Sequence, residues 1–157
     1  MKRRQQGVTT VEFAIVGSVS MILLFGVIEI GRAMFVMNTL GETTRRAARI
    51  ATVCPVNDPA PTEVALFNEP GGGTGSRIVG GLQPQNITIE YLDASGAAIA
   101  DPVANFGQIR FVRSRIVNFQ HQMLIPFLQR IFTTPEFSTT LRRESLGVPR
   151  TGAVQPC

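Results

Sequence analysis

Hydrophobic and polar positions divide the chain into an apolar amino-terminal segment and a mixed remainder. Residues 13–28, FAIVGSVSMILLFGVI, carry no charge, and Glu12 is the only charged residue between Val8 and Ile28. At about 1.5 Å per helical residue, that segment is roughly 31 Å long, close to the thickness of a bilayer hydrocarbon core. The pattern therefore predicts a transmembrane helix over residues 8–30.

A different periodicity follows this segment and predicts that the same helix continues. Apolar residues recur near helical spacing on one side, and charged residues gather on another, which is typical of an amphipathic helix. Pro55 then disfavours helical geometry at the residue before it. We therefore expect one helix over about residues 8–53, with residues 31–54 as its amphipathic continuation. The apolar positions are Val36, Leu40, Ala47, Ala51 and Cys54, and the charged ones are Glu42, Arg45, Arg46 and Arg49.

Residues 55–157 have the pattern of a small α+β region. Alternation and β-branched residues predict strands at 86–92, 109–119 and 137–146. A short helix is expected at 62–68 with Thr62 as its cap, and a short helix or wide turn at 123–132. The predicted fold class is α+β, with the long helix packed on a small antiparallel sheet.

The strand at 109–119 contains a conflict between charge and burial. Ile109, Phe111, Val117 and Phe119 share one side of the strand, but Arg113 and Arg115 lie on that same side. We therefore expect this strand to twist, bulge or leave the core midway.

The charge distribution argues against a nucleic-acid partner and for a membrane orientation. The net charge is +4, but three of the 15 basic residues are Lys2, Arg3 and Arg4. Without them the chain is nearly neutral, so it lacks the basic surface that binds phosphate backbones. Basic residues before an apolar segment predict a cytoplasmic amino terminus and a periplasmic remainder. No A-x-A cleavage site ends the segment, so we expect it to stay in the membrane.

The residues offer little catalytic chemistry. His121 is the only histidine, and we expect it to lie solvated in a loop. No nucleophile elbow is present, and residues 71–76, GGGTGS, lack the lysine that a phosphate-binding loop needs. We expect no enzymatic activity, no cofactor and no metal. The two cysteines, Cys54 and Cys157, fit either one disulfide in an oxidising compartment or two free thiols.

Glu12 requires a partner, because a carboxylate near hydrocarbon is costly when unpaired. If a protease cut after Gly7, Val8 would carry an α-amine that is charged below about pH 8. In helices packed with an axial stagger, the amine of one chain could then meet Glu12 of another. The alternative is an interfacial glutamate on a plain single-span anchor.

These residues together carry a resemblance to a known family. A basic leader ending in Gly7 precedes Val11, Glu12 and Phe13, and FGVIEIGR at 25–32 and TTRRAARIA at 43–51 follow. Over about residues 3–51 the chain resembles the TadE-like family, pseudopilins or minor pilins of the Tad (tight adherence, Flp) pilus apparatus in the type IV pilin superfamily. The family usually has proline where Gly17 stands, which leaves helix bending and subunit packing open.

The resemblance implies a processing and assembly scheme. Residues 1–7 would be a leader that a prepilin peptidase removes between Gly7 and Val8, and Glu12 and Phe13 would serve assembly. The implied partners are that peptidase, other pilin or pseudopilin subunits and the Tad assembly platform in the bacterial inner membrane. Glu29 and Arg32 would lie at the outer membrane interface, either as a subunit contact or as a local pair.

Two readings besides the pilus subunit remain open. One is a single-pass anchored periplasmic scaffold that is never cut and does not polymerise. The other is an anchored periplasmic enzyme, which would need a cleft with polar groups around His121. Residues 55–157 would form the periplasmic globular region in each case, and a processed chain would begin at Val8.

Overall fold

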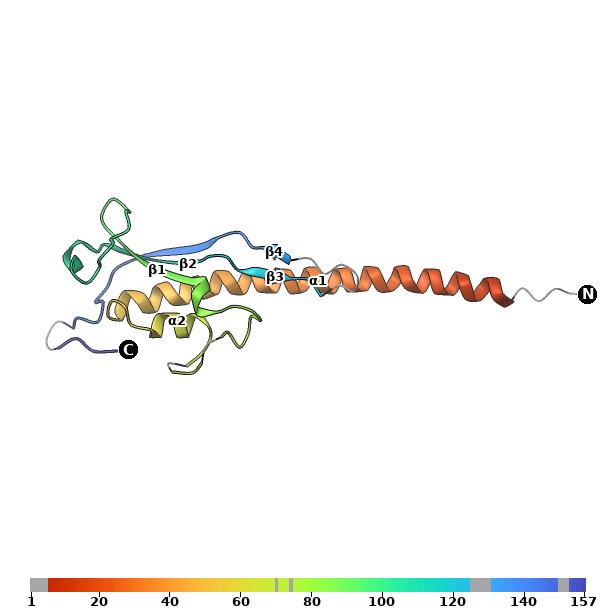
Figure 1. The fold of residues 1–157 in the computed structure, drawn as a ribbon, viewed down its shortest axis with the longest axis horizontal. Coiled ribbons are helices and arrows are strands. Elements are labelled where there is room, and N and C mark those ends of the chain that lie inside the picture. Colours follow the sequence, from red (N-terminus) through yellow and green to blue (C-terminus); the bar gives the residue numbers. More distant parts are fainter. Residues whose placement is uncertain (1–5, 70, 74, 125–130, 150–152) are drawn as a thin grey trace, which may run out of the picture.

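One long helix organises the structure. The computed structural model describes residues 6–69, 71–73, 75–124, 131–149 and 153–157. Helix α1, Gln6–Val53, has 48 residues and is therefore about 72 Å long. In Figure 1 its amino-terminal half extends alone, and its carboxyl-terminal half lies within the folded region. This confirms the single helix that the two hydrophobic patterns predicted.

The rest of the chain packs around the carboxyl-terminal half of α1. Strands β1 (Ile87–Leu92), β2 (Phe111–Ile116) and β5 (Phe137–Arg142) form an antiparallel sheet in the order β1-β2-β5. Strands β3 (Gln120–Gln122) and β4 (Ile131–Thr133) pair as a separate two-stranded sheet beside α1. Helix α2 (Ala60–Ala65) covers α1 on the side away from the sheet (Figure 1). The predicted α+β class is confirmed.

The core follows the apolar stripe of α1. Val36, Leu40 and Ala47 are buried in a cluster that includes Leu66 and Ile116. A second cluster, nearer the end of the helix, contains Ala51, Tyr91, Val112 and Leu146. The charged face predicted from the sequence, Glu42, Arg45, Arg46 and Arg49, is exposed.

The side of β2 that packs on the core differs from the expectation. Val112, Ser114 and Ile116 are the buried positions, whereas Arg113 and Arg115 lie on the outer face. The strand therefore does not leave the core at its arginines. The alternation changes later, at Asn118, whose φ of 55° bends the chain before Phe119 returns to the core.

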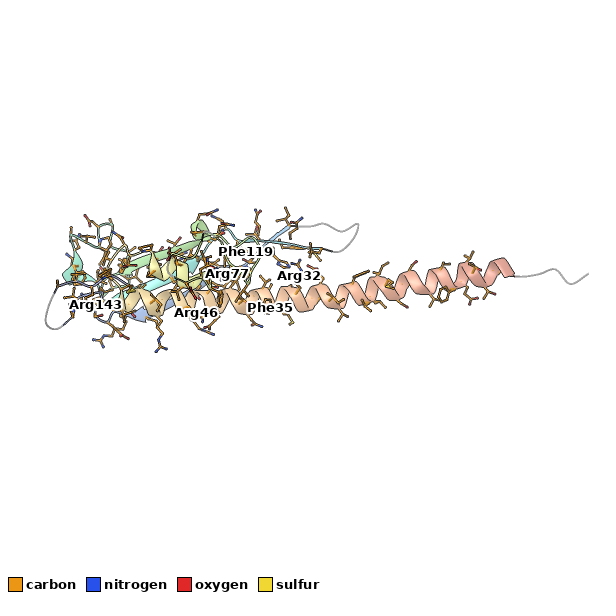
Figure 2. The ribbon with its side chains drawn as sticks, turned by 90° about the horizontal axis from the view of Figure 1, so that it is seen from below. Arg32, Phe35, Arg46, Arg77, Phe119 and Arg143 are labelled. Atoms are coloured by element: carbon orange, nitrogen blue, oxygen red, sulfur yellow. A yellow bond between two sulfur atoms is a disulfide. The ribbon has the colours of Figure 1, made fainter. Side chains whose placement is uncertain are left out.

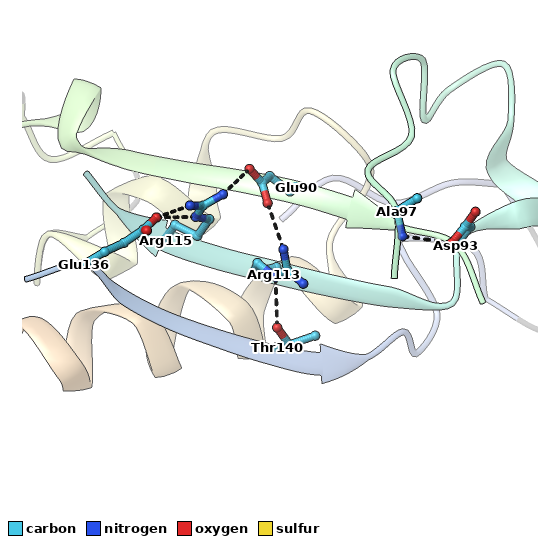
Figure 3. A network of polar contacts seen from close by, with 7 residues as sticks. All are labelled: Glu90, Asp93, Ala97, Arg113, Arg115, Glu136 and Thr140. Carbon is cyan, nitrogen blue, oxygen red and sulfur yellow. Dashed lines mark hydrogen bonds and ion pairs between the residues drawn. The ribbon is translucent and has the colours of Figure 1, made fainter. Parts of the chain in front are cut away.

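Ion pairs account for the outward-facing arginines (Figure 3). Glu90 on β1 lies 3.6 Å from Arg113 Nη1 and 3.2 Å from Arg115 Nη1. Arg115 also pairs with Glu136, and Arg113 Nε donates to Thr140 Oγ1 at 3.2 Å. Because opposite charges on neighbouring strands stabilise a sheet surface, the arginines are satisfied without entering the core.

Several predicted boundaries are wrong. Helix α2 begins at Ala60 rather than Thr62, with Pro59 before it and no side-chain cap. β2 and β5 are shorter than the predicted strands 109–119 and 137–146, and both leave the sheet after six residues. Within the predicted helix or turn at 123–132, residues 125–130 lie outside the described part, and Ile131–Thr133 form β4.

The carboxyl-terminal end of α1 is closed by a segment that follows β5. The amides of Glu144 and Leu146 donate to the carbonyl of Thr52, and the amide of Gly147 donates to that of Val53 at 2.6 Å. These bonds satisfy carbonyls that a helix end leaves without partners. Beside them Cys54 and Cys157 form a disulfide with a Cα–Cα distance of 5.7 Å, the first of the two alternatives from the sequence.

Candidate functional site

The amino-terminal half of α1 presents an apolar surface on all sides. Among the described residues, one helix is long and apolar enough to cross a membrane, with a mean hydropathy of 2.3 over its most apolar window. Only 6% of that window is buried within the chain. A helix that is apolar all round requires a membrane or other helices to cover it.

The residues expected to serve processing and assembly lie on this uncovered segment. Gly7 is in the first turn of α1, and Val8 follows with 69% of its surface exposed. Glu12 is exposed one turn later and forms no ion pair with any residue that the structure describes. Phe13 is 78% exposed. The carboxylate therefore remains available for a cation outside the chain.

Glu29 has a different environment, although it lies on the same helix. Its surface is only 6% exposed, because the β3–β4 hairpin covers it. Arg32 Nη2 lies 2.6 Å from Glu29 Oε1, and Arg32 Nε lies 3.3 Å from Glu29 Oε2. The predicted local pair of Glu29 and Arg32 is thus present in the structure.

Arg32 also connects α1 to the hairpin. Its Nη2 donates to the carbonyl of Gln122, a residue 90 positions away in the sequence. In Figure 2 the Arg32 side chain lies where α1 passes the β3–β4 hairpin. The Glu29–Arg32 pair therefore anchors the end of the folded region that is nearest the free helix.

His121 belongs to the same cluster, and the expectation of a solvated loop histidine is wrong. It lies in β3, is 8% exposed, and its Nε2 is 3.5 Å from Glu29 Oε1. That contact does not have hydrogen-bond geometry, so the buried Nε2 has no hydrogen-bond partner in the described part of the chain. Phe119 and His121 are both buried, with the exposed Gln120 between them, and this alternation is a sequence signal that could have indicated burial of His121.

An apolar groove of about 490 Å³ lies beside this cluster, between α1 and the hairpin. Gly26, Ile30, Ala33 and Met37 line it from the helix, and Phe132 lines it from β4. Among the described residues that line it, Glu29 and His121 are the only titratable ones. The groove therefore offers an apolar surface with a carboxylate and an imidazole at one place.

The same arrangement provides no obvious catalytic machinery. No group of three His, Cys, Asp or Glu side chains within the described ranges is placed to hold a metal ion. The cysteines are joined to each other. The site is best described as two surfaces, the free apolar helix with Glu12 and the groove with the Glu29–Arg32–His121 cluster.

Comparison with known families agrees with the resemblance seen in the sequence. A family model described as TadE-like protein matches residues 7–49, which include Glu12, Glu29 and Arg32. The match ends close to the end of α1 and does not extend into the sheet. No curated protein and no solved structure matches the chain.

Proposed function

We propose that this chain is a pseudopilin or minor pilin of a Tad-type (Flp) pilus system. The observation that carries the proposal is the uncovered apolar half of α1, on which Glu12 is exposed and forms no ion pair with any described residue. The TadE-like match covers this half of the helix and its continuation to residue 49. A subunit that assembles through its helix needs such a surface, whereas a plain anchor has no use for a carboxylate at that depth.

The proposal includes anchoring in the bacterial inner membrane. The amino terminus lies in the cytoplasm, since Lys2, Arg3 and Arg4 precede the apolar segment. The folded region then lies in the periplasm. The Cys54–Cys157 disulfide supports this orientation, because disulfides persist in the periplasm and are rare in the cytoplasm.

Processing gives Glu12 its partner. A prepilin peptidase removes residues 1–7, and the α-amine of Val8 becomes a cation on the apolar segment. The amine of one subunit pairs with Glu12 of a neighbour, and exposed apolar residues such as Phe13 pack between the helices. Removing one partner of a buried ion pair costs about 3–5 kcal/mol, because the other charge stays buried without a partner. We therefore expect the loss of either charge to impair assembly. Other pilin subunits and the Tad assembly platform are the remaining partners.

The alternative is an anchored periplasmic scaffold that is never cut. Amino-terminal sequencing of the protein extracted from membranes separates the two, because only the pilus subunit begins at Val8. We expect Gly7→Leu to keep residues 1–7 and to abolish incorporation into pili, since a bulky side chain replaces the glycine before the scissile bond.

Gly17→Leu is the matched control for this experiment. It makes the same substitution in the same helix, at a position with no atom within 4 Å of an added Cβ. We expect it to be cut as the wild type is. Wild-type protein that retains Met1 as its first residue would exclude processing and leave the scaffold.

A further inference from the structure

The apolar surface of α1 is longer than a bilayer can cover. Exposed apolar residues continue from Val8 to Met37, which is roughly 44 Å of helix. The hydrocarbon core is about 30 Å thick, and covering the whole length by tilting would need more than the usual tilt of up to about 40°. About 14 Å of apolar helix, with Ile30, Met34 and Phe35 exposed on it, therefore lies outside the membrane. The groove lies along this surplus segment.

The charges of a processed amino terminus match those at the groove. After cleavage, one turn of helix carries the positive α-amine of Val8 and, four residues later, the negative Glu12. One turn beside the groove carries the negative Glu29 and, three residues later, the positive Arg32. When two parallel helices are offset by about 20 residues, or ~30 Å, each charge meets its opposite.

The groups at the groove have capacity for these contacts. A carboxylate offers about four acceptor sites. Arg32 engages two of those of Glu29, and the backbone amide of Leu124 engages a third. Arg32 Nη1 is not engaged by any residue in the described part of the chain. His121 Nε2, which is buried and has no hydrogen-bond partner among the described residues, lies in the same wall.

We propose that the groove is the docking site for the amino-terminal turns of a second, processed copy of this chain. The α-amine of Val8 of that copy pairs with Glu29, its Glu12 pairs with Arg32, and its Val11 and Ile15 lie against Ile30 and Ala33. This contact rests on the proposed function, because it needs the amine that cleavage creates. The Val8 amine can make this contact in addition to its proposed contact with Glu12 of another neighbour, because an ammonium has three donors.

A second copy fits the groove better than other occupants. Both helices enter the membrane from the same side, so they are parallel, as the charge match requires. The occupant must be apolar, helical and uncharged beyond its first turns, and residues 13–28 have no charge. An offset of ~30 Å is also about one bilayer thickness, so a docked copy would be displaced outward by the length of its membrane segment.

Cysteine crosslinking in intact pilus-forming cells tests the contact with the full chain, because a docked copy is displaced outward from the membrane. The pair Val11→Cys and Ile30→Cys places one thiol on the docking turn and one in the groove. The matched control is Val11→Cys with Ile28→Cys, because Ile28 is exposed at nearly the same depth but does not line the groove. We expect mild oxidation to give a ladder of oligomers with the first pair, several-fold stronger than with the control. Mass spectrometry checks that the Cys54–Cys157 bridge stays intact in both.

The charge pairing has its own variants. Glu12→Gln removes a charge that contacts nothing within the described chain, so we expect the fold to be preserved. The crosslinked oligomers of the Val11→Cys/Ile30→Cys pair should become about tenfold weaker, equivalent to 1.4 kcal/mol. In the Gly7→Leu background the Val8 nitrogen stays an amide, and we expect a comparable loss. Equal ladders for the two cysteine pairs, or a ladder insensitive to both substitutions, would overturn the proposal.

A photocrosslinking side chain at Val11 gives a readout that adds no thiol. Adducts within residues 26–37 or on β4 of another copy support docking in the groove. Adducts confined to residues 8–25 mean that helices pack in register, and they exclude the groove. Failure of the proposed function is detected separately, as an uncut wild-type amino terminus in sequencing.

Discussion

Gly147 provides the sharpest test of how the folded region is held on the end of α1. Its amide donates to the carbonyl of Val53, and its φ is +75°, a conformation that side chains with a Cβ rarely adopt. A Cβ added there would lie 2.5 Å from Pro55 Cγ and 2.8 Å from Pro55 N. Those atoms belong to the turn directly after Cys54, so neither the backbone nor the proline can move without disturbing the helix end.

We therefore expect Gly147→Ala to lower the free energy of unfolding by about 2–5 kcal/mol. About 1–2 kcal/mol comes from placing a Cβ at positive φ. A further 1–3 kcal/mol or so comes from overpacking against Pro55. Gly96→Ala is the matched control, because Gly96 has a φ of +84° but no atom within 4 Å of an added Cβ. The free energy of unfolding of Gly96→Ala should therefore fall only by the contribution of about 1–2 kcal/mol that comes from placing a Cβ at positive φ.

Urea titration in detergent, followed by the fluorescence of Tyr91, measures both variants. Tyr91 is the only tyrosine, the chain has no tryptophan, and Tyr91 lies in the same core cluster as Leu146, the residue before Gly147. A loss of about 3 kcal/mol moves the midpoint by roughly 1–3 M. If Gly147→Ala unfolds at the same urea concentration as Gly96→Ala, the contact with Pro55 does not hold this end of the fold.

Three further predictions concern assembly, the disulfide and the core. Glu12→Val should insert normally but form fewer pili at equal expression, because the amine of a neighbour loses its partner; normal piliation would make the carboxylate dispensable. Alkylation without reductant should modify neither Cys54 nor Cys157. Replacing both by serine should lower the free energy of unfolding by up to about 4.7 kcal/mol, because the bridge closes a loop with a sequence separation of 103. Burial raises the pKa of Tyr91, so the absorbance of the folded protein should titrate above the value of about 10 expected for the protein unfolded in urea. The stability that neutral Tyr91 contributes should be lost as the pH rises through the folded-state pKa. Identical titrations of the folded and unfolded protein would show that the ring is hydrated.

The parts of the fold that depend on local pattern could be predicted from the sequence. Helix α1 extends over the range that its apolar segment and the stripe from Val36 to Ala51 indicated, because both periodicities report burial on the same element. The face of β2 could not be predicted in this way. Arg113 and Arg115 are tolerated outside because Glu90 lies on β1 and Glu136 lies directly before β5. Those partners are visible only once the pairing of the strands is known.

In the candidate site, too, the residues that depend on local sequence spacing could be predicted, and those that depend on tertiary contacts could not. Gly7 and Glu12 could be proposed as candidates because only five positions, less than two helical turns, separate them. The environment of Glu29 could not, since the hairpin that buries it comes from about 90 residues further along the sequence, and His121 was misplaced for that reason. Pairing a carboxylate with a distant strand is a tertiary event with no local signature.

The exposed half of α1 is itself an argument about function. Folding usually removes apolar side chains from water, and this chain does so only along the carboxyl-terminal half of α1. Over the most apolar window 94% of the residues stay uncovered. The bilayer accounts for at most about 30 Å of the roughly 44 Å of helix over which exposed apolar residues continue, from Val8 to Met37. The surplus near Ile30 and Phe35 has no cover within the described chain. Exposed apolar surface of this kind marks a site that a membrane or a partner protein covers, and the length beyond the bilayer supports the proposal that this chain is one subunit of an assembly.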